Sequence, residues 1–85
     1  MLTPVMISLD RLFARPPGAP RHVVETGLDL TGAVPGHLHG RFPSAEGDWL
    51  GVVNYSIGYA DGRQQIVSLI DQLVPFHTLR LREPR

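Results

Sequence analysis

The fold class of this 85-residue chain is decided by residues 48–73, which read DWLGVVNYSIGYADGRQQIVSLIDQL. Between Trp49 and Tyr59 the odd-numbered positions are mostly apolar or aromatic, and several even-numbered positions are small or polar. A period of two is typical of a β-strand with one apolar face. Asp61-Gly62 follows, and this dipeptide favours a two-residue type I′ turn because both of its central residues take a positive φ.

A second strand over residues 64–73 is expected to return after this turn. A two-residue loop fixes the register, because each residue before the turn then has one partner after it. The expected pairs are Tyr59 with Gln64, Ile57 with Ile66, Tyr55 with Ser68, and Val53 with Ile70. This register places apolar side chains opposite one another, and we expect Trp49, Tyr55 and Ile57 to fill the core.

Shorter strands are expected on both sides of this hairpin. Residues 21–26 and 37–42 are interpreted as strands separated by a Gly- and Pro-containing loop, with a polar turn at residues 44–48. Downstream, Pro75 cannot donate a ladder hydrogen bond, so the long strand is expected to end there. One 3₁₀ turn and an edge strand from Leu79 then complete the chain.

The N-terminal part has a different composition, so residues 1–15 are interpreted as an apolar arm, 16–20 as a proline-rich linker and 21–85 as a small β-barrel domain. Thr3-Pro4 fits the cap and first position of a helix. Val5, Ile7 and Leu9 also alternate as a strand would, but we expect a short helix or turn. An arm this apolar is expected to pack on the barrel or on a second copy.

Two stretches resemble the Src-homology-3-like small barrel: residues 47–51, which read GDWLG, and residues 73–79, which read LVPFHTL. Tudor-type barrels share much of this pattern. The resemblance implies a mainly β fold, either a small barrel or a strongly bent antiparallel sheet, with a short N-terminal helix or arm. It also implies that Trp49 and Pro75 line a groove for proline-rich peptides, although Thr78 stands where the family has an aromatic residue.

Composition restricts the function classes. The chain has no cysteine, which excludes disulfides, thiol nucleophiles and cysteine-ligated metals and favours the cytoplasm. No apolar stretch is long enough for a membrane-spanning helix, and no signal peptide is expected. Lys plus Arg and Asp plus Glu both number 8, so no basic excess indicates a non-specific polyanion binder.

An aromatic set is the first candidate site. Trp49, Tyr59, Pro75 and Phe76 are proposed to form a surface for a protein partner or a second copy, because aromatic residues and arginine dominate interface hot spots. The sequence contains no nucleophile elbow, phosphate-binding glycine loop or metal-ligand signature, so we expect neither catalytic residues nor a cofactor. The expected function is a non-enzymatic interaction module.

Arginines and histidines give the alternatives. A nucleic-acid-associated barrel would contact phosphates through its arginines, namely Arg41, Arg63, Arg80, Arg82 and Arg85. His37 and His39 share a face if they lie on a strand, and two imidazoles are a weak candidate for a zinc site that still lacks a third ligand. Solvent-facing histidines, or a patch that responds to pH, are the other interpretations.

Overall fold

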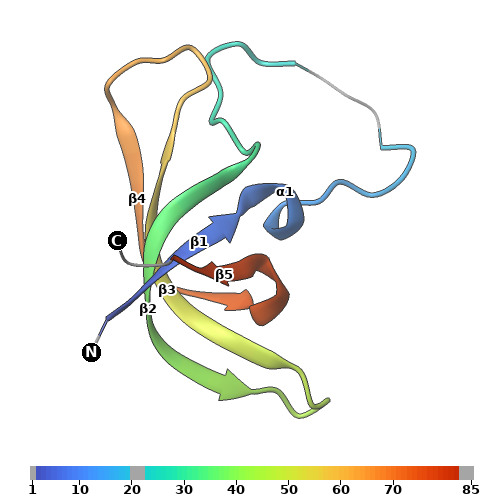
Figure 1. Cartoon of the computed structure of the whole chain (residues 1–85). Coiled ribbons are helices and arrows are strands. Elements are labelled where there is room, and N and C mark those ends of the chain that lie inside the picture. The colour runs from blue at the N-terminus through green and yellow to red at the C-terminus, as the bar shows by residue number, and fades with distance from the viewer. Residues whose placement is uncertain (1, 20–22, 83–85) are drawn as a thin grey trace.

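The computed structural model describes residues 2–19 and 23–82 and is mainly β, as expected from the sequence (Figure 1). Its strands are β1 (Thr3–Ser8), β2 (Ala33–Pro43), β3 (Trp49–Gly58), β4 (Ile66–Pro75) and β5 (Leu79–Leu81). One helical turn, α1 (Leu9–Leu12), follows β1, and one 3₁₀ turn, η1 (Phe76–Thr78), connects β4 to β5. All paired strands run antiparallel.

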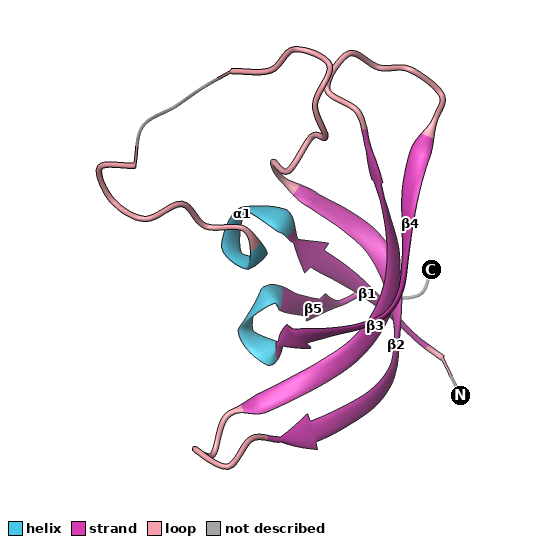
Figure 2. Cartoon of the chain, turned by 180° about the vertical axis from the view of Figure 1, so that it is seen from behind, coloured by secondary structure: helices cyan, strands magenta, loops and turns pink. Residues whose placement is uncertain are grey.

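The strands form one sheet in the order β4-β3-β2-β1-β5, which bends strongly but does not close (Figures 1 and 2). Of the two expected forms, the closed barrel is therefore wrong and the bent antiparallel sheet is confirmed. β4 pairs with β3 and β5 pairs with β1, so these two strands form the edges. Register shifts within the β2–β3 and β3–β4 pairs mark the β-bulges that bend such a sheet.

The helix expected to start at Thr3 is wrong, because the alternation of Val5, Ile7 and Leu9 decides the local structure. All three side chains are buried. β1 lies between β2 and β5, so this segment is an interior strand of the sheet. The helical turn begins one element later, where the Ser8 hydroxyl accepts a hydrogen bond of 3.3 Å from the backbone N–H of Arg11.

Apolar side chains from β1, the start of α1, β3 and the end of β4 form the core. Its buried members are Val5, Ile7, Leu9, Val53, Tyr55, Ile57 and Val74. Tyr55 and Ile57 are thus confirmed as core residues. Trp49, the third expected member, is instead 51% exposed, because β3 extends beyond the core at that end.

The hairpin of β3 and β4 is confirmed, but its register is wrong by one residue near the turn and by two beyond the bulge, where Val53 pairs with Gln72 instead of Ile70. Ile57 pairs with Val67 instead of Ile66. The connection spans residues 59–65, and Gly62 has a φ of 79° whereas Asp61 is not left-handed, which excludes a type I′ turn. The loop is longer because it bonds elsewhere: the Ala60 N–H donates to the Gly27 carbonyl over 2.9 Å.

The remaining expectations are confirmed in the second half of the chain and are partly wrong in the first half. The turn at residues 44–48 is confirmed by a 2.7 Å hydrogen bond from the Ser44 N–H to the Asp48 carbonyl. β4 ends at Pro75, the 3₁₀ turn follows, and β5 lies at an edge, all as expected. The strand expected at residues 21–26 lies partly outside the described residues, and its described part, 23–26, is not a strand. β2 begins at Ala33, four residues earlier than expected.

Candidate functional site

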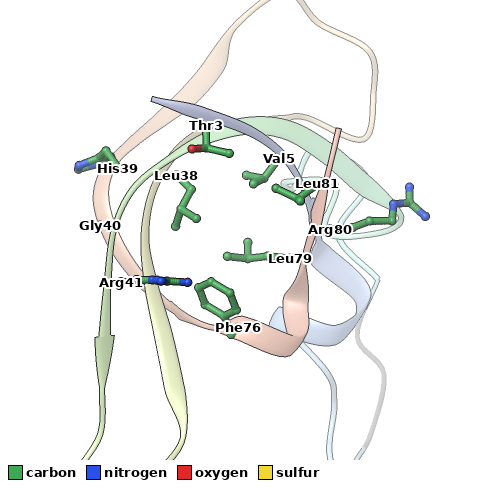
Figure 3. A pocket seen from close by; sticks show the side chains of 10 residues that line it. All are labelled: Thr3, Val5, Leu38, His39, Gly40, Arg41, Phe76, Leu79, Arg80 and Leu81. Carbon is green, nitrogen blue, oxygen red and sulfur yellow. The ribbon is translucent and has the colours of Figure 1, made fainter. Parts of the chain in front are cut away.

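A pocket of about 430 Å³ opens on the concave side of the sheet, and we call it the concave pocket (Figure 3). Strands β1, β2 and β5 and the turn η1 all contribute to its wall. The lining residues are Thr3, Val5, Leu38, His39, Gly40, Arg41, Phe76, Leu79, Arg80 and Leu81. Figure 3 shows the apolar side chains directed inward, whereas His39 and Arg80 point away from the pocket.

Gly51 of β3 makes room for the side chains that meet at one end of this pocket. A Cβ atom at this position would lie 2.7 Å from Cδ1 of Leu38, 3.0 Å from Cδ1 of Leu79 and 3.4 Å from Cε1 of Phe76. These three side chains come from β2, β5 and η1, so the absent side chain lets distant segments converge. Gly51 therefore has a packing role beside the pocket.

Arg41 and Trp49 lie next to each other on the face that carries the pocket. The register pairs Arg41 with Gly51 and Pro43 with Trp49, which places both side chains on one side of the sheet. The guanidinium carbon of Arg41 lies 5.6 Å from the centroid of the indole ring, within the range of a cation–π contact. In Figure 3 the Arg41 side chain is directed toward Phe76.

The four residues expected to form a partner-binding surface divide into two groups. Phe76 lines the concave pocket, and Trp49 contacts Arg41, which also lines it. Pro75 precedes Phe76 and pairs with Leu50 at the end of β4. Tyr59 lies beyond the opposite end of β3, where the Arg63 guanidinium carbon is 4.5 Å from its ring centroid. The structure therefore does not bring Tyr59 to this site.

The five candidate arginines do not form one patch. Arg41 and Arg80 both line the concave pocket. Arg63 forms a 2.6 Å ion pair with Asp61, which holds the pKa of that carboxyl below its usual value and raises the pKa of the guanidinium. Nη2 of Arg82 donates to the Gly36 carbonyl over 3.3 Å. Arg85 lies outside the described residues.

The two candidate histidines have separate surroundings on β2. Nε2 of His39 lies 3.2 Å from Oδ1 of Asn54 and 3.1 Å from a carboxylate oxygen of Asp71. The Asp71 N–H donates to the same Asn54 oxygen over 2.9 Å. His37 is the register partner of Asn54. Within the described residues no three His, Cys, Asp or Glu side chains form a group suited to a metal ion.

Sequence reasoning missed this His39–Asn54–Asp71 cluster. His39 is the extra residue of the β2–β3 bulge, and Asp71 lies in the β3–β4 bulge. Asp71 also has a φ of 55°, the left-handed region that aspartate and asparagine tolerate better than most residues. An alternation pattern does not reveal where a β-bulge falls. The contact between these three side chains therefore could not be predicted from the local sequence.

Two exposed carboxylates with lowered pKa values are explained by local turns. The Thr31 hydroxyl and N–H donate to Oδ1 of Asp29, over 2.6 Å and 3.1 Å, and lower the pKa of that carboxyl. Asp61 is held by Arg63. Neither carboxylate lines the concave pocket. Burial raises the pKa of the Tyr55 phenol, which belongs to the core.

A second exposed apolar surface lies on the opposite side of the sheet, and we call it the outer apolar face. Its residues are Phe42, Ile66, Ile70 and Leu73, which are 55%, 59%, 65% and 59% exposed. Three of them belong to β4, whose ten residues include one charged side chain, Asp71. Most of this face therefore lies on the edge strand β4.

Among residues 2–19 and 23–82, no helix has the length and apolar character needed to cross a membrane. In comparisons with protein-family models, with curated proteins and with solved structures, this chain matches none.

Proposed function

We propose that this chain is a small non-enzymatic interaction module that binds a protein partner at the concave pocket. The observation that carries this proposal is the Arg41–Trp49 pair beside a pocket lined by Leu38, Phe76 and Leu79. Tryptophan and arginine are enriched among the residues that contribute most to protein–protein affinity, and such residues act next to desolvated apolar pockets. The volume of about 430 Å³ lies within the range of binding sites.

The order of elements supports the resemblance to Src-homology-3-like barrels. β4 ends at Pro75, one 3₁₀ turn follows, and a short final strand returns to the sheet. Trp49 and Phe76 belong to the two stretches that carry the resemblance; Phe76 lines the pocket, and Trp49 contacts Arg41, which also lines it. The absence of cysteine supports a location in the reducing cytoplasm. The perturbed carboxylates, Asp29 and Asp61, belong to turns and support the non-enzymatic assignment.

Selection from a random peptide library displayed on phage tests the proposal. We expect the chain to enrich peptides that share a bulky apolar residue. Trp49→Ala should weaken their binding at least tenfold, because the half-exposed indole contributes to the site more than to the core. Arg63→Ala is the matched control, because Arg63 contacts an aromatic ring at the far end of β3.

Two outcomes would overturn the proposal. In the first, the same peptides bind Trp49→Ala and the unmodified chain equally, so that the concave pocket has no role. In the second, no peptide enriches, whereas single-stranded DNA binds at low salt and is released steeply as salt rises, which indicates phosphate contacts by the arginines.

Self-association is a second candidate function, favoured by the outer apolar face. A long apolar edge strand with few charges is a template for pairing with another strand, and a second copy offers the same edge in antiparallel orientation. Ile70→Lys should therefore shift sedimentation from dimer to monomer. Val23→Lys, in a loop and 78% exposed, is the control that should leave the dimer intact. A chain that is monomeric at high concentration would contradict this candidate.

A further inference from the structure

We infer that the concave pocket recognises a bulky apolar side chain with an adjacent carboxylate in a partner peptide, the carboxylate pairing with Arg41. This inference rests on the proposed function and names the chemistry of the partner. The apolar side chain would occupy the space between Leu38, Phe76 and Leu79, and the anion would lie at the rim. Three observations support it: the apolar wall, the charge of the lining and the state of Arg41.

The charged side chains that line the pocket are all positive. Its charged lining residues are Arg41 and Arg80, and no aspartate or glutamate lines it. Of the two arginines, Arg41 is the one whose side chain is directed inward, toward Phe76, in Figure 3. An occupant that complements this site has an apolar part and a negative group beside it.

Arg41 is positioned for an anion that the described chain does not supply. Its guanidinium contacts the face of Trp49, which leaves the N–H groups at the edge of the guanidinium plane as donors. These donors match both oxygens of a carboxylate, because arginine presents them in a planar fork. No described carboxylate forms an ion pair with Arg41.

The chain contains an internal comparison for this argument. Arg63 also lies over an aromatic ring, that of Tyr59, but two of its nitrogens donate to the Asp61 carboxylate. An arginine that lies over an aromatic ring thus also donates hydrogen bonds to a carboxylate in this protein where one is within reach. Arg41 also lies over a ring, at the longer distance of 5.6 Å, and no described carboxylate pairs with it, so we assign that anion to the partner.

The experiment uses the fluorescence of Trp49, the single tryptophan of the chain, as the probe of binding. Four short peptides are titrated: one ending in leucine with a free carboxylate, the same peptide as its amide, acetyl-Asp-Leu-amide, and acetyl-Asn-Leu-amide. We expect at least one carboxylate peptide to bind tenfold more tightly than its neutral counterpart. The two acidic peptides distinguish a terminal carboxylate from an aspartate side chain.

Arginine variants complete the test. Arg41→Gln should abolish the preference for the carboxylate peptide, whereas the matched Arg63→Gln should retain it. Equal binding of acidic and neutral peptides would overturn the carboxylate assignment and leave the proposed function intact. A tenfold preference that survives in Arg41→Gln would also overturn it. No binding of any of the four peptides, with none enriched from the library, would overturn both.

Discussion

Asp71 has its backbone in the left-handed region, with a φ of 55°, and it is the one described residue other than glycine to do so. An L-residue with a Cβ in this conformation is destabilised by about 1–2 kcal/mol, and a short polar side chain reduces that penalty. Here the Asp71 N–H donates to the Asn54 side chain, and its carboxylate contacts His39. One residue therefore stabilises the place where two neighbouring β-bulges meet.

Substitution of Asp71 tests this assignment. Asp71→Val should lower the free energy of unfolding by about 1–2 kcal/mol, because a β-branched side chain does not tolerate a positive φ. Asp71→Asn is the matched control and should retain most of the stability, since asparagine adopts this conformation readily. Urea denaturation measures both variants. Equal loss of stability in the two would instead assign the effect to the His39 contact.

Tyr55 gives the second prediction at this scale. Burial raises the pKa of its phenol in the folded chain above the ordinary value of 10.0. Below that value both states keep the proton and the full stability is present. As pH rises further the unfolded chain loses its proton first, so stability falls. Tyr55→Phe should lose less stability between about pH 9 and about pH 11, measured by urea denaturation. An identical fall in both proteins would contradict this origin.

At the scale of elements, the sheet depends on a close approach of β1, β2 and β3 at Gly36. A Cβ there would lie 2.5 Å from the backbone oxygen of Asn54 and 2.7 Å from Cδ1 of Ile7. The first of these atoms belongs to the backbone of the paired strand and cannot rotate away. Glycine at this position therefore determines how tightly the three strands pack.

Gly36→Ala should lower the free energy of unfolding by about 2–3 kcal/mol through overpacking. Gly58→Ala is the control, because its added Cβ would meet no atom within 4 Å and its φ is not positive. We expect that control to change stability by less than about 0.5 kcal/mol. Thermal unfolding followed by circular dichroism compares the two. Similar melting temperatures for the two variants would show that β1, β2 and β3 accommodate the added Cβ at position 36 without a loss of stability.

Several elements were predictable because their signals are local. Alternation gave β3, and the prolines at 43 and 75 marked where β2 and β4 end. Register was not predictable, since the loop after Tyr59 is set by hydrogen bonding to Gly27, which is far away in sequence. The same reason applies to the site: Phe76 and Trp49 were identified as candidates, but their meeting with Arg41 depends on the topology.

At the scale of the whole molecule, β1 connects the edge strand β5 to the rest of the sheet. It pairs with β2 on one side and with β5 on the other, and it carries Val5 and Ile7 into the core. Removing a strand in this position would expose core side chains, leave β5 without a strand partner and leave one edge of β2 unpaired. The N-terminal segment is therefore required for the fold.

Deletion of residues 1–15 should leave a chain with no cooperative unfolding transition. The deletion removes β1 and the buried Leu9, so β5 loses its only strand partner among the described residues. Leu2→Ser is the control and should unfold normally, because Leu2 is 55% exposed and precedes β1. Calorimetry and amide dispersion in NMR spectra make the comparison. A sharp transition in the shortened chain would show that β1 is dispensable.

The pairing of β1 with β5 also has a consequence for the order of folding. Val5 pairs with Leu81, so β1 acquires its second neighbour only after the chain has been made as far as residue 81. Contacts between such distant positions slow folding, because a long loop must close before they form. On a ribosome, β1 to β4 would emerge with one side of β1 still open. Once residues 79–81 have left the exit tunnel, β5 would complete the sheet.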